Sequence, residues 1–208
     1  MFRACSVVAH ALAAGAARVI PVEQVEAARA LKAEHPDWLL VGERHARRLP
    51  GFDCGNSPTE VLAAGPLVGR TLIHTTHAGT QGLSAAARSA DAVLTGAFVN
   101  AAATVRRVHA LGAREVSIVA MGHEAREHCI EDDLCRQLLL ARLLRRPFDL
   151  GSIAPTLRMA PAAVKFFDPA ADWAPEGDFA LCSAVDVVDF AVQLRRQPEG
   201  FEALERAC

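Results

Sequence analysis

Three polar segments of the chain have residue types that could do chemistry on a small anion. The first is the loop 51–58 (Gly-Phe-Asp-Cys-Gly-Asn-Ser-Pro), which follows Glu43 and Arg44 after a short turn. Its two glycines allow close approach of the backbone, while Asn56, Ser57 and the upstream Glu–Arg pair supply acceptors, donors and a planar cation. This combination could hold an oxyanion together with a metal ion. The loop is therefore predicted to line a site.

The second segment, Thr75 to Gly82, lies where a predicted strand passes into a helix. Its amides and hydroxyls could hold a phosphate at the N-terminus of that helix. The alternative is an ordinary turn in which Thr80 caps the helix. Two histidines, His74 and His77, flank the threonines, and either could be a general acid or only a hydrogen-bonding residue.

The third segment, residues 122–133, concentrates ionisable side chains after a predicted strand. Glu131 and Asp132 are the metal candidates, because carboxylate oxygens are preferred ligands of Mg²⁺. The alternative is that these acids only stabilise the first turn of the next helix, by about 0.3–1 kcal/mol each. His123 and His128 suggest a transition metal, but their spacing does not place both on one helical face.

Helical and strand patterns alternate along the first two thirds of the chain. The predicted strands are 18–22, 38–43, 71–75, 92–95 and 115–120. The predicted helices are 6–17, 23–34, 59–64, 80–88, 99–111 and 130–144. This alternation predicts one domain over residues 1–208, a three-layer α/β/α sandwich with a largely parallel or mixed sheet. Ligands of such sheets bind at the carboxyl ends of strands, so the loops after Val41, Ile73, Leu94 and Ala120 are expected to line one cleft.

The last third of the chain has weaker patterns. Residues 147–178 contain five prolines and are predicted to be irregular or to form short helices. A strand followed by a helix is expected over 179–194, and a terminal helix over 199–207.

Composition excludes several classes of protein. The 208 residues include 22 Lys and Arg against 24 Asp and Glu, so the net charge of -2 predicts no general attraction to nucleic acid or to anionic membranes. Apolar runs stop short of the roughly 20 residues that a membrane-spanning helix needs, and no secretion signal is evident. We expect a soluble cytoplasmic protein with reduced cysteines; a homodimer stays open. The chain also lacks GxSxG and GxGxxG motifs.

Colinear motifs over about residues 2–140 resemble the 2-phosphosulfolactate phosphatase (ComB-like) family. The matching segments are 2–6 (Phe-Arg-Ala-Cys-Ser), 11–22, 41–44 (Val-Gly-Glu-Arg), 51–58, 75–80, 96–101 (Gly-Ala-Phe-Val-Asn-Ala) and 131–135. The resemblance implies magnesium-dependent hydrolysis of 2-phosphosulfolactate, or of a related small phosphorylated acid, to the hydroxy acid and phosphate. It leaves open whether water or a side chain attacks phosphorus.

The resemblance also implies roles for individual residues. The catalytic residues would be Glu43, Asn56, Glu131 and Asp132, of which Glu43, Glu131 and Asp132 would hold Mg²⁺. The groups that grip the phosphate and the other acid groups would be Arg3, Ser6, Arg44, Ser57, Thr75, Thr76, His77, Gly79 and Thr80. The partner would be a small anionic phosphomonoester.

The chain departs from the family pattern at two places, and from Pro147 onward it matches the family only loosely. His77 and Ala78 replace the usual Thr-Asn of the phosphate loop, which predicts a shifted substrate preference. The family's first strand and an Asp before Phe2 are absent, and we expect the native protein to extend upstream of Met1, with a valine codon read as the start. One alternative function is a non-catalytic, anion-binding relic of the same fold. Another is a different hydrolase that uses His77 as its acid.

Overall fold

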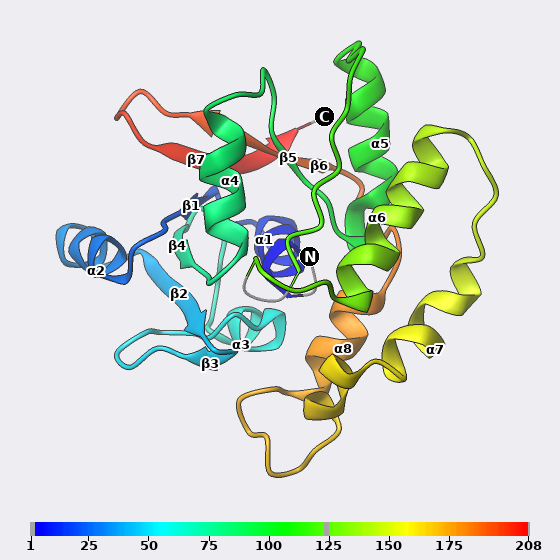
Figure 1. Ribbon diagram of the computed structural model, residues 1–208. Helices are drawn as coiled ribbons and strands as arrows, with labels where there is room; N and C mark the ends of the chain where they lie inside the picture. Colours follow the sequence, from blue (N-terminus) through cyan, green and yellow to red (C-terminus); the bar gives the residue numbers. More distant parts are fainter. Residues whose placement is uncertain (1–2, 123–124, 208) are drawn as a thin grey trace.

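The computed structural model describes residues 3–122 and 125–207 (Figure 1). Met1, Phe2, His123, Glu124 and Cys208 lie outside the described residues, so a family strand before Phe2 stays a prediction. Within the described residues, no helix is long and apolar enough to cross a membrane. The five cysteines described are all free thiols, as expected.

A mixed sheet of seven strands forms the centre of the structure, in the order β3-β2-β4-β1-β7-β6-β5. The strands are β1 (Arg18–Pro21), β2 (Leu39–Arg44), β3 (Arg47–Arg48), β4 (Thr71–Thr75), β5 (Leu94–Thr95), β6 (Ala191–Arg196) and β7 (Glu202–Ala207). The neighbours β2, β4 and β1 are parallel, and every other pairing is antiparallel. The predicted α/β fold with a mixed sheet is therefore confirmed.

Eight α-helices and three 3-10 helices surround this sheet in the described part of the chain (Figure 1). The α-helices are α1 (Ala4–Ala13), α2 (Val25–Glu34), α3 (Pro58–Ala63), α4 (Gly79–Ala87), α5 (Ala101–Ala110), α6 (Ile130–Leu143), α7 (Ile153–Arg158) and α8 (Glu176–Ser183). The 3-10 helices are η1 (Phe98–Asn100), η2 (Leu150–Ser152) and η3 (Pro161–Phe166).

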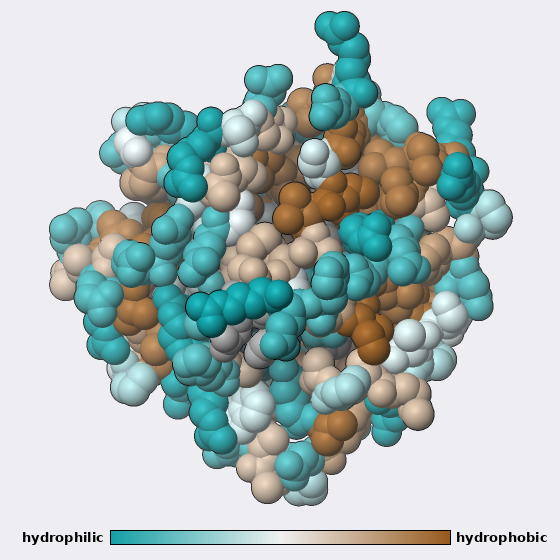
Figure 2. All heavy atoms as spheres, viewed as in Figure 1, coloured by the Kyte–Doolittle hydropathy of each residue, from teal (hydrophilic) through white to brown (hydrophobic). Residues whose placement is uncertain are grey.

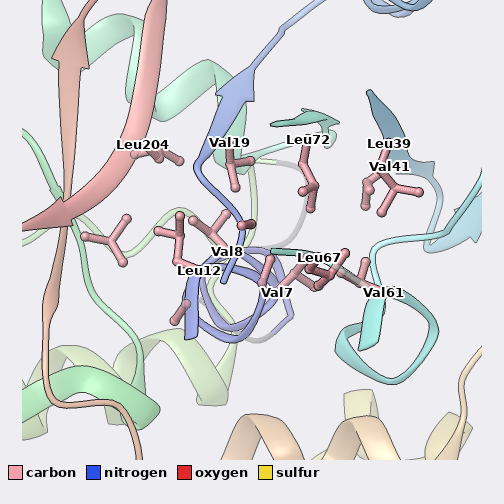
Figure 3. Close-up of a cluster of buried hydrophobic side chains, with 14 of the residues drawn as sticks. Val7, Val8, Leu12, Val19, Leu39, Val41, Val61, Leu67, Leu72 and Leu204 are labelled. Atoms are coloured by element: carbon pink, nitrogen blue, oxygen red, sulfur yellow. The ribbon is translucent and has the colours of Figure 1, made fainter. Parts of the chain in front are cut away.

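Helices lie on both faces of the sheet because its inner strands carry apolar side chains on both faces. Val7, Val8 and Leu12 of α1 pack with Val61 of α3 against one face, where Val19 of β1 contributes to the cluster (Figure 3). Helix α1 is apolar around most of its circumference, which suits a helix that is buried between other elements. The opposite face packs against α2, and a separate apolar cluster joins α5, α6, α7, η3 and α8.

The loop 51–58 runs along β2 and is part of this packing. Gly42 of β2 donates its amide to the carbonyl of Cys54 (3.1 Å). A side chain at Gly42 would come within 2.6 Å of the Thr75 carbonyl and 2.9 Å of the Phe52 ring, so only glycine fits there. The loop is thereby held at the carboxyl end of β2.

The predictions for three segments are wrong. The segment 115–120 forms no strand and lies outside the sheet, with Val116 43% and Val119 63% exposed, and apolar side chains gather beside it over α5 and α6 (Figure 2). Residues 179–194 form a helix and then a strand, the reverse of the predicted order, and the predicted terminal helix is strand β7. Strands β6 and β7 form a hairpin within the sheet. Pairing with β6 makes residues 202–207 a strand, although their local sequence favours a helix.

Candidate active site

A two-residue hairpin turn places Glu43 at the carboxyl end of β2. His45 and Ala46 form this turn with φ angles of 51° and 63°, in the left-handed region. One carboxylate oxygen of Glu43 accepts a hydrogen bond from the Ala46 amide (2.8 Å), and the other accepts from the His77 amide (2.9 Å). Glu43 is only 8% exposed. Its carboxylate thus joins the β2–β3 turn to the turn before α4.

Ala46 adopts a left-handed backbone conformation that favours glycine. A left-handed alanine costs about 1–2 kcal/mol, whereas glycine adopts this conformation freely and loses about 0.5–1 kcal/mol more entropy on folding. We therefore expect Ala46→Gly to raise the free energy of unfolding by about 0.5–1 kcal/mol, because the amide that bonds Glu43 is retained. Urea denaturation at pH 7 measures this change. A loss of stability in the variant would mean that the turn is not strained at Ala46.

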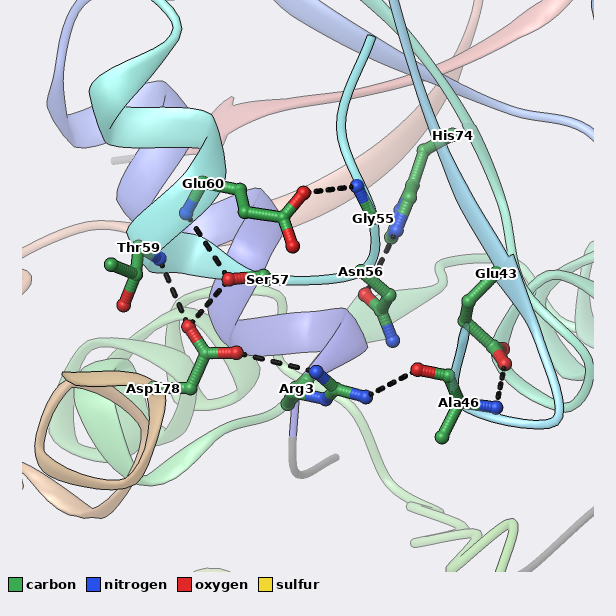
Figure 4. A network of polar contacts seen from close by, with 10 residues as sticks. All are labelled: Arg3, Glu43, Ala46, Gly55, Asn56, Ser57, Thr59, Glu60, His74 and Asp178. Carbon is green, nitrogen blue, oxygen red and sulfur yellow. Dashed lines mark hydrogen bonds and ion pairs between the residues drawn. The ribbon is translucent and has the colours of Figure 1, made fainter. Parts of the chain in front are cut away.

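A buried ion pair lies next to this turn (Figure 4). Arg3 donates to Asp178 (3.3 Å) and to the carbonyl of Ala46 (3.1 Å). Asp178 also accepts from the Ser57 hydroxyl (2.7 Å) and the Thr59 amide (3.0 Å). The exposed fractions are 4% for Arg3 and 0% for Asp178. Asp178 therefore fixes Arg3 and the first turn of α3 to α8.

The loop 51–58 presents an amide side chain beside Arg3. Asn56 accepts a hydrogen bond from the imidazole of His74 at 3.1 Å, and burial lowers the pKa of His74 to about 4. The imidazole is therefore neutral at pH 7 and donates one proton to the Asn56 oxygen. In Figure 4 the amide nitrogen of Asn56 points away from His74, toward the side of Arg3 and Ala46. It is placed to donate to an anion there.

The lowered pKa of His74 predicts a dependence of stability on pH. The ordinary value of 6.5 applies to the unfolded chain and about 4 to the folded protein, so the unfolded state binds more protons between these values. Stability is then lost as pH falls from 6.5 toward 4. We expect His74→Gln, which keeps a side-chain donor, to weaken the fall between pH 7 and 4.5 by about 1–3 kcal/mol. Urea titrations at both pH values test this, and an unchanged fall in the variant would contradict it.

The start of α4 has satisfied hydroxyls. The Thr80 amide donates to the Thr76 hydroxyl (3.3 Å), and the Thr80 hydroxyl donates to the Thr76 carbonyl (2.8 Å). Thr80 is the second residue of α4 and does not cap the helix; the Thr76 hydroxyl accepts the amide of Thr80 instead. A side chain at Gly79 would lie 3.4 Å from Ala4, so the first turn of α4 packs against the first turn of α1.

Two predicted residues lie on the other face of the sheet. Side chains alternate along a strand, so Arg44 points away from the face that Glu43 occupies. Arg44 donates to the Thr75 hydroxyl (3.0 Å) and to the carbonyl of Glu23 (2.9 Å), just before α2. The structure therefore separates Arg44 and Thr75 from Glu43, and their role in substrate binding stays a prediction.

The loop after Leu94 also lies away from the site. Strand β5 is antiparallel to β6, which is antiparallel to β7, and β7 is antiparallel to β1. The carboxyl end of β5 is therefore at the opposite edge of the sheet from the carboxyl ends of β1, β2 and β4. This loop does not join the cleft that was expected to include it.

The start of α6 brings acidic residues toward α1. Asp132 is buried and accepts a hydrogen bond from the Gly122 amide (2.8 Å). Burial chiefly raises the pKa of the Cys5 thiol in α1, and the charge of Asp132 raises this pKa as well. Burial raises the pKa of the Cys182 thiol in α8 to about 12, and a hydrogen bond with the hydroxyl of Ser6 acts in the opposite direction. The hydroxyl of Ser6 is thus engaged between α1 and α8.

The ammonium group of Lys165 in η3 is affected by acidic residues of β2, α6 and α8. Burial chiefly lowers its pKa, followed by the positive charge of Arg3, whereas Glu131, Glu43 and Asp178 raise it. Glu131 and Glu43, from segments far apart in sequence, therefore both lie within electrostatic range of one ammonium group.

The predicted metal ligands form no three-carboxylate cluster. Within residues 3–122 and 125–207, no three His, Cys, Asp or Glu side chains gather as a metal site. Mg²⁺ is commonly bound by one or two carboxylates, with water and substrate oxygens in the other positions. Glu43 suits that donor set, since each of its oxygens accepts one amide and keeps a further lone pair; the metal-binding roles of Glu131 and Asp132 stay predictions.

Two residues of this site were missed by sequence reasoning. Asp178 and Lys165 both lie in the proline-rich part that was predicted to be irregular. The only local signals were an acid beside Phe179 and a lysine before two phenylalanines, and neither indicates a contact with α1.

Comparisons with known proteins identify the family of this chain. The model of the 2-phosphosulpholactate phosphatase family matches residues 1–166. A probable 2-phosphosulfolactate phosphatase of Deinococcus radiodurans is 40% identical over 126 residues, which are 61% of this chain and 52% of that protein. The corresponding protein of Thermus thermophilus is 38% identical over 155 residues, 74% of this chain and 62% of that protein.

A third relative aligns over more of its length. The probable 2-phosphosulfolactate phosphatase of Clostridium novyi is 30% identical over 201 residues, covering 91% of this chain and 84% of that protein. The aligned part of this chain spans 52% and 62% of the Deinococcus and Thermus relatives.

Proposed function

Since this chain belongs to the 2-phosphosulfolactate phosphatase family, we propose that it hydrolyses 2-phosphosulfolactate, or a related small phosphorylated acid, to the hydroxy acid and phosphate. The proposal rests mainly on the environment of Glu43. Its buried carboxylate is held by two backbone amides beside the cation Arg3 and the amide of Asn56 (Figure 4). Such a site offers an anion and a cation to one ligand within a small volume.

Preorganised donors give the site its affinity for phosphate. Arg3 is held by Asp178 and by the carbonyl of Ala46, so its guanidinium loses little further entropy when it binds an oxyanion. The Asn56 amide is oriented by His74 and donates from the same side. Helices α1 and α4 direct their first turns toward this region, and helix N-termini favour anions.

The proposed reaction also requires Mg²⁺. Glu43 and Glu131, with Asp132 directly or through water, would hold the ion. When bound, Mg²⁺ neutralises phosphate oxygens and stabilises the leaving alkoxide. Glu43 keeps its orientation through the Ala46 and His77 amides, and Lys165 supplies a positive charge near Glu131.

Phosphate release from a panel of phosphorylated hydroxy acids tests this function. We expect turnover with Mg²⁺, none after treatment with EDTA, and recovery when Mg²⁺ is added back. Binding of 2-phosphosulfolactate without turnover would support the non-catalytic relic instead. Turnover that EDTA does not change would remove magnesium from the proposal.

A further inference from the structure

Three cations surround two aromatic rings at the edge of the candidate active site. Lys165 places its ammonium 5.2 Å from the centre of the Phe166 ring and 5.9 Å from that of Trp173. The guanidinium of Arg3 lies 5.7 Å from the Phe166 ring, and that of Arg47 lies 5.2 Å from the Trp173 ring. The cations come from the start of α1, from β3 and from η3, so the fold brings them together over long sequence separations.

Two of these cations have no anionic partner. In the part of the chain that the structure describes, neither Lys165 nor the side chain of Arg47 forms a hydrogen bond or an ion pair. Of the three acids whose charge acts on Lys165, Asp178 bonds Arg3 and Glu43 bonds two backbone amides, while Glu131 forms no ion pair with Lys165 in the described residues. Aromatic rings hold a cation in place without neutralising its charge, so both cations keep their attraction for an anion.

Arg47 and Lys165 lie close to Arg3, the proposed phosphate ligand. Arg3 contacts the Phe166 ring that Lys165 also contacts, and Arg3 bonds the carbonyl of Ala46, the residue before Arg47. A molecule whose phosphate lies at Arg3 and Asn56 would therefore extend its other end toward Arg47 and Lys165. Those cations suit a strongly anionic end rather than a neutral one.

We propose that Arg47 and Lys165 form a second anion subsite, which binds a sulfonate or carboxylate group on the same small molecule whose phosphate is hydrolysed. This inference rests on the proposed function and adds the residues that select polyanionic esters. The aromatic rings of Phe166 and Trp173 fix the distance between the two subsites.

Steady-state kinetics of Lys165→Met and Arg47→Met test the subsite, because methionine keeps an apolar stem on each ring. With 2-phosphosulfolactate, we expect each variant to raise KM by about tenfold or more while kcat changes by less than about threefold. With p-nitrophenyl phosphate, which has no second acid group, Arg47→Met should keep the KM and kcat of the unchanged protein. Arg146→Met, at an exposed arginine beyond α6, is the matched control.

Other measurements separate this inference from the proposed function. If the unchanged protein hydrolyses 2-phosphosulfolactate but both variants keep its KM, the subsite is overturned and the function stands. If nothing is hydrolysed, calorimetric binding of 2-phosphosulfolactate still decides: a tenfold loss in both variants supports the subsite, and equal affinity overturns it. Lys165→Arg should recover most of the affinity that Lys165→Met loses, which a packing role would not predict.

Discussion

Replacing Glu43 with glutamine is expected to lower kcat for phosphate release by about 10²–10³-fold. The substitution removes the negative charge that would hold Mg²⁺, although the side chain keeps its size. It also places an NH₂ group against one of the two backbone amides that now donate to the carboxylate, from Ala46 and His77. Two donors then face each other, and one turn must shift.

The measurement is phosphate release at saturating 2-phosphosulfolactate, with Mg²⁺ varied. Glu26→Gln, the same change at an exposed residue of α2, should keep full activity. Urea denaturation must accompany the kinetics, because a buried amide without a partner costs about 1–3 kcal/mol. If Glu43→Gln folds and keeps activity within a few-fold of the unchanged protein, the carboxylate has no part in catalysis.

The N-terminal part of the fold was predictable because its signals are local. Strand 71–75 and the helix starting near Ile130 occur where the pattern placed them, since each combines an apolar run with polar residues at its ends. The hairpin of β6 and β7 was not predictable in this way. Residues Ala203, Leu204 and Glu205 of β7 favour a helix, and pairing with β6 and β1 makes them a strand.

The candidate site shows the same limit. Glu43 and Asn56 were predicted from loop composition, and both lie at the carboxyl end of β2 and near Arg3 (Figure 4). Strand alternation alone could have separated Arg44 from Glu43, because adjacent residues point to opposite faces. No local rule could have found Asp178, because its partners Ser57 and Arg3 are 121 and 175 residues away in the sequence.

Replacing Asp178 with alanine is expected to lower the free energy of unfolding by about 3–5 kcal/mol, the largest effect on stability predicted here. The change leaves the guanidinium of Arg3 buried without its carboxylate and removes the acceptor of the Ser57 hydroxyl and the Thr59 amide. Urea denaturation measures the loss. Asp172→Ala, at an exposed aspartate in the same segment, should change stability by less than about 0.5 kcal/mol.

A double substitution tests whether the uncompensated charge is the cause. Arg3→Met removes the cation, so in that background Asp178→Leu leaves neither charge buried and fills the space with apolar atoms. Replacing both members of a buried ion pair is often far less costly than breaking it. We therefore expect Arg3→Met/Asp178→Leu to be more stable than Asp178→Ala by about 1–3 kcal/mol, and yet inactive, because Arg3 is the proposed phosphate ligand. If the double variant is no more stable than Asp178→Ala, the hydrogen bonds from Ser57 and Thr59, rather than the charge of Arg3, account for the effect.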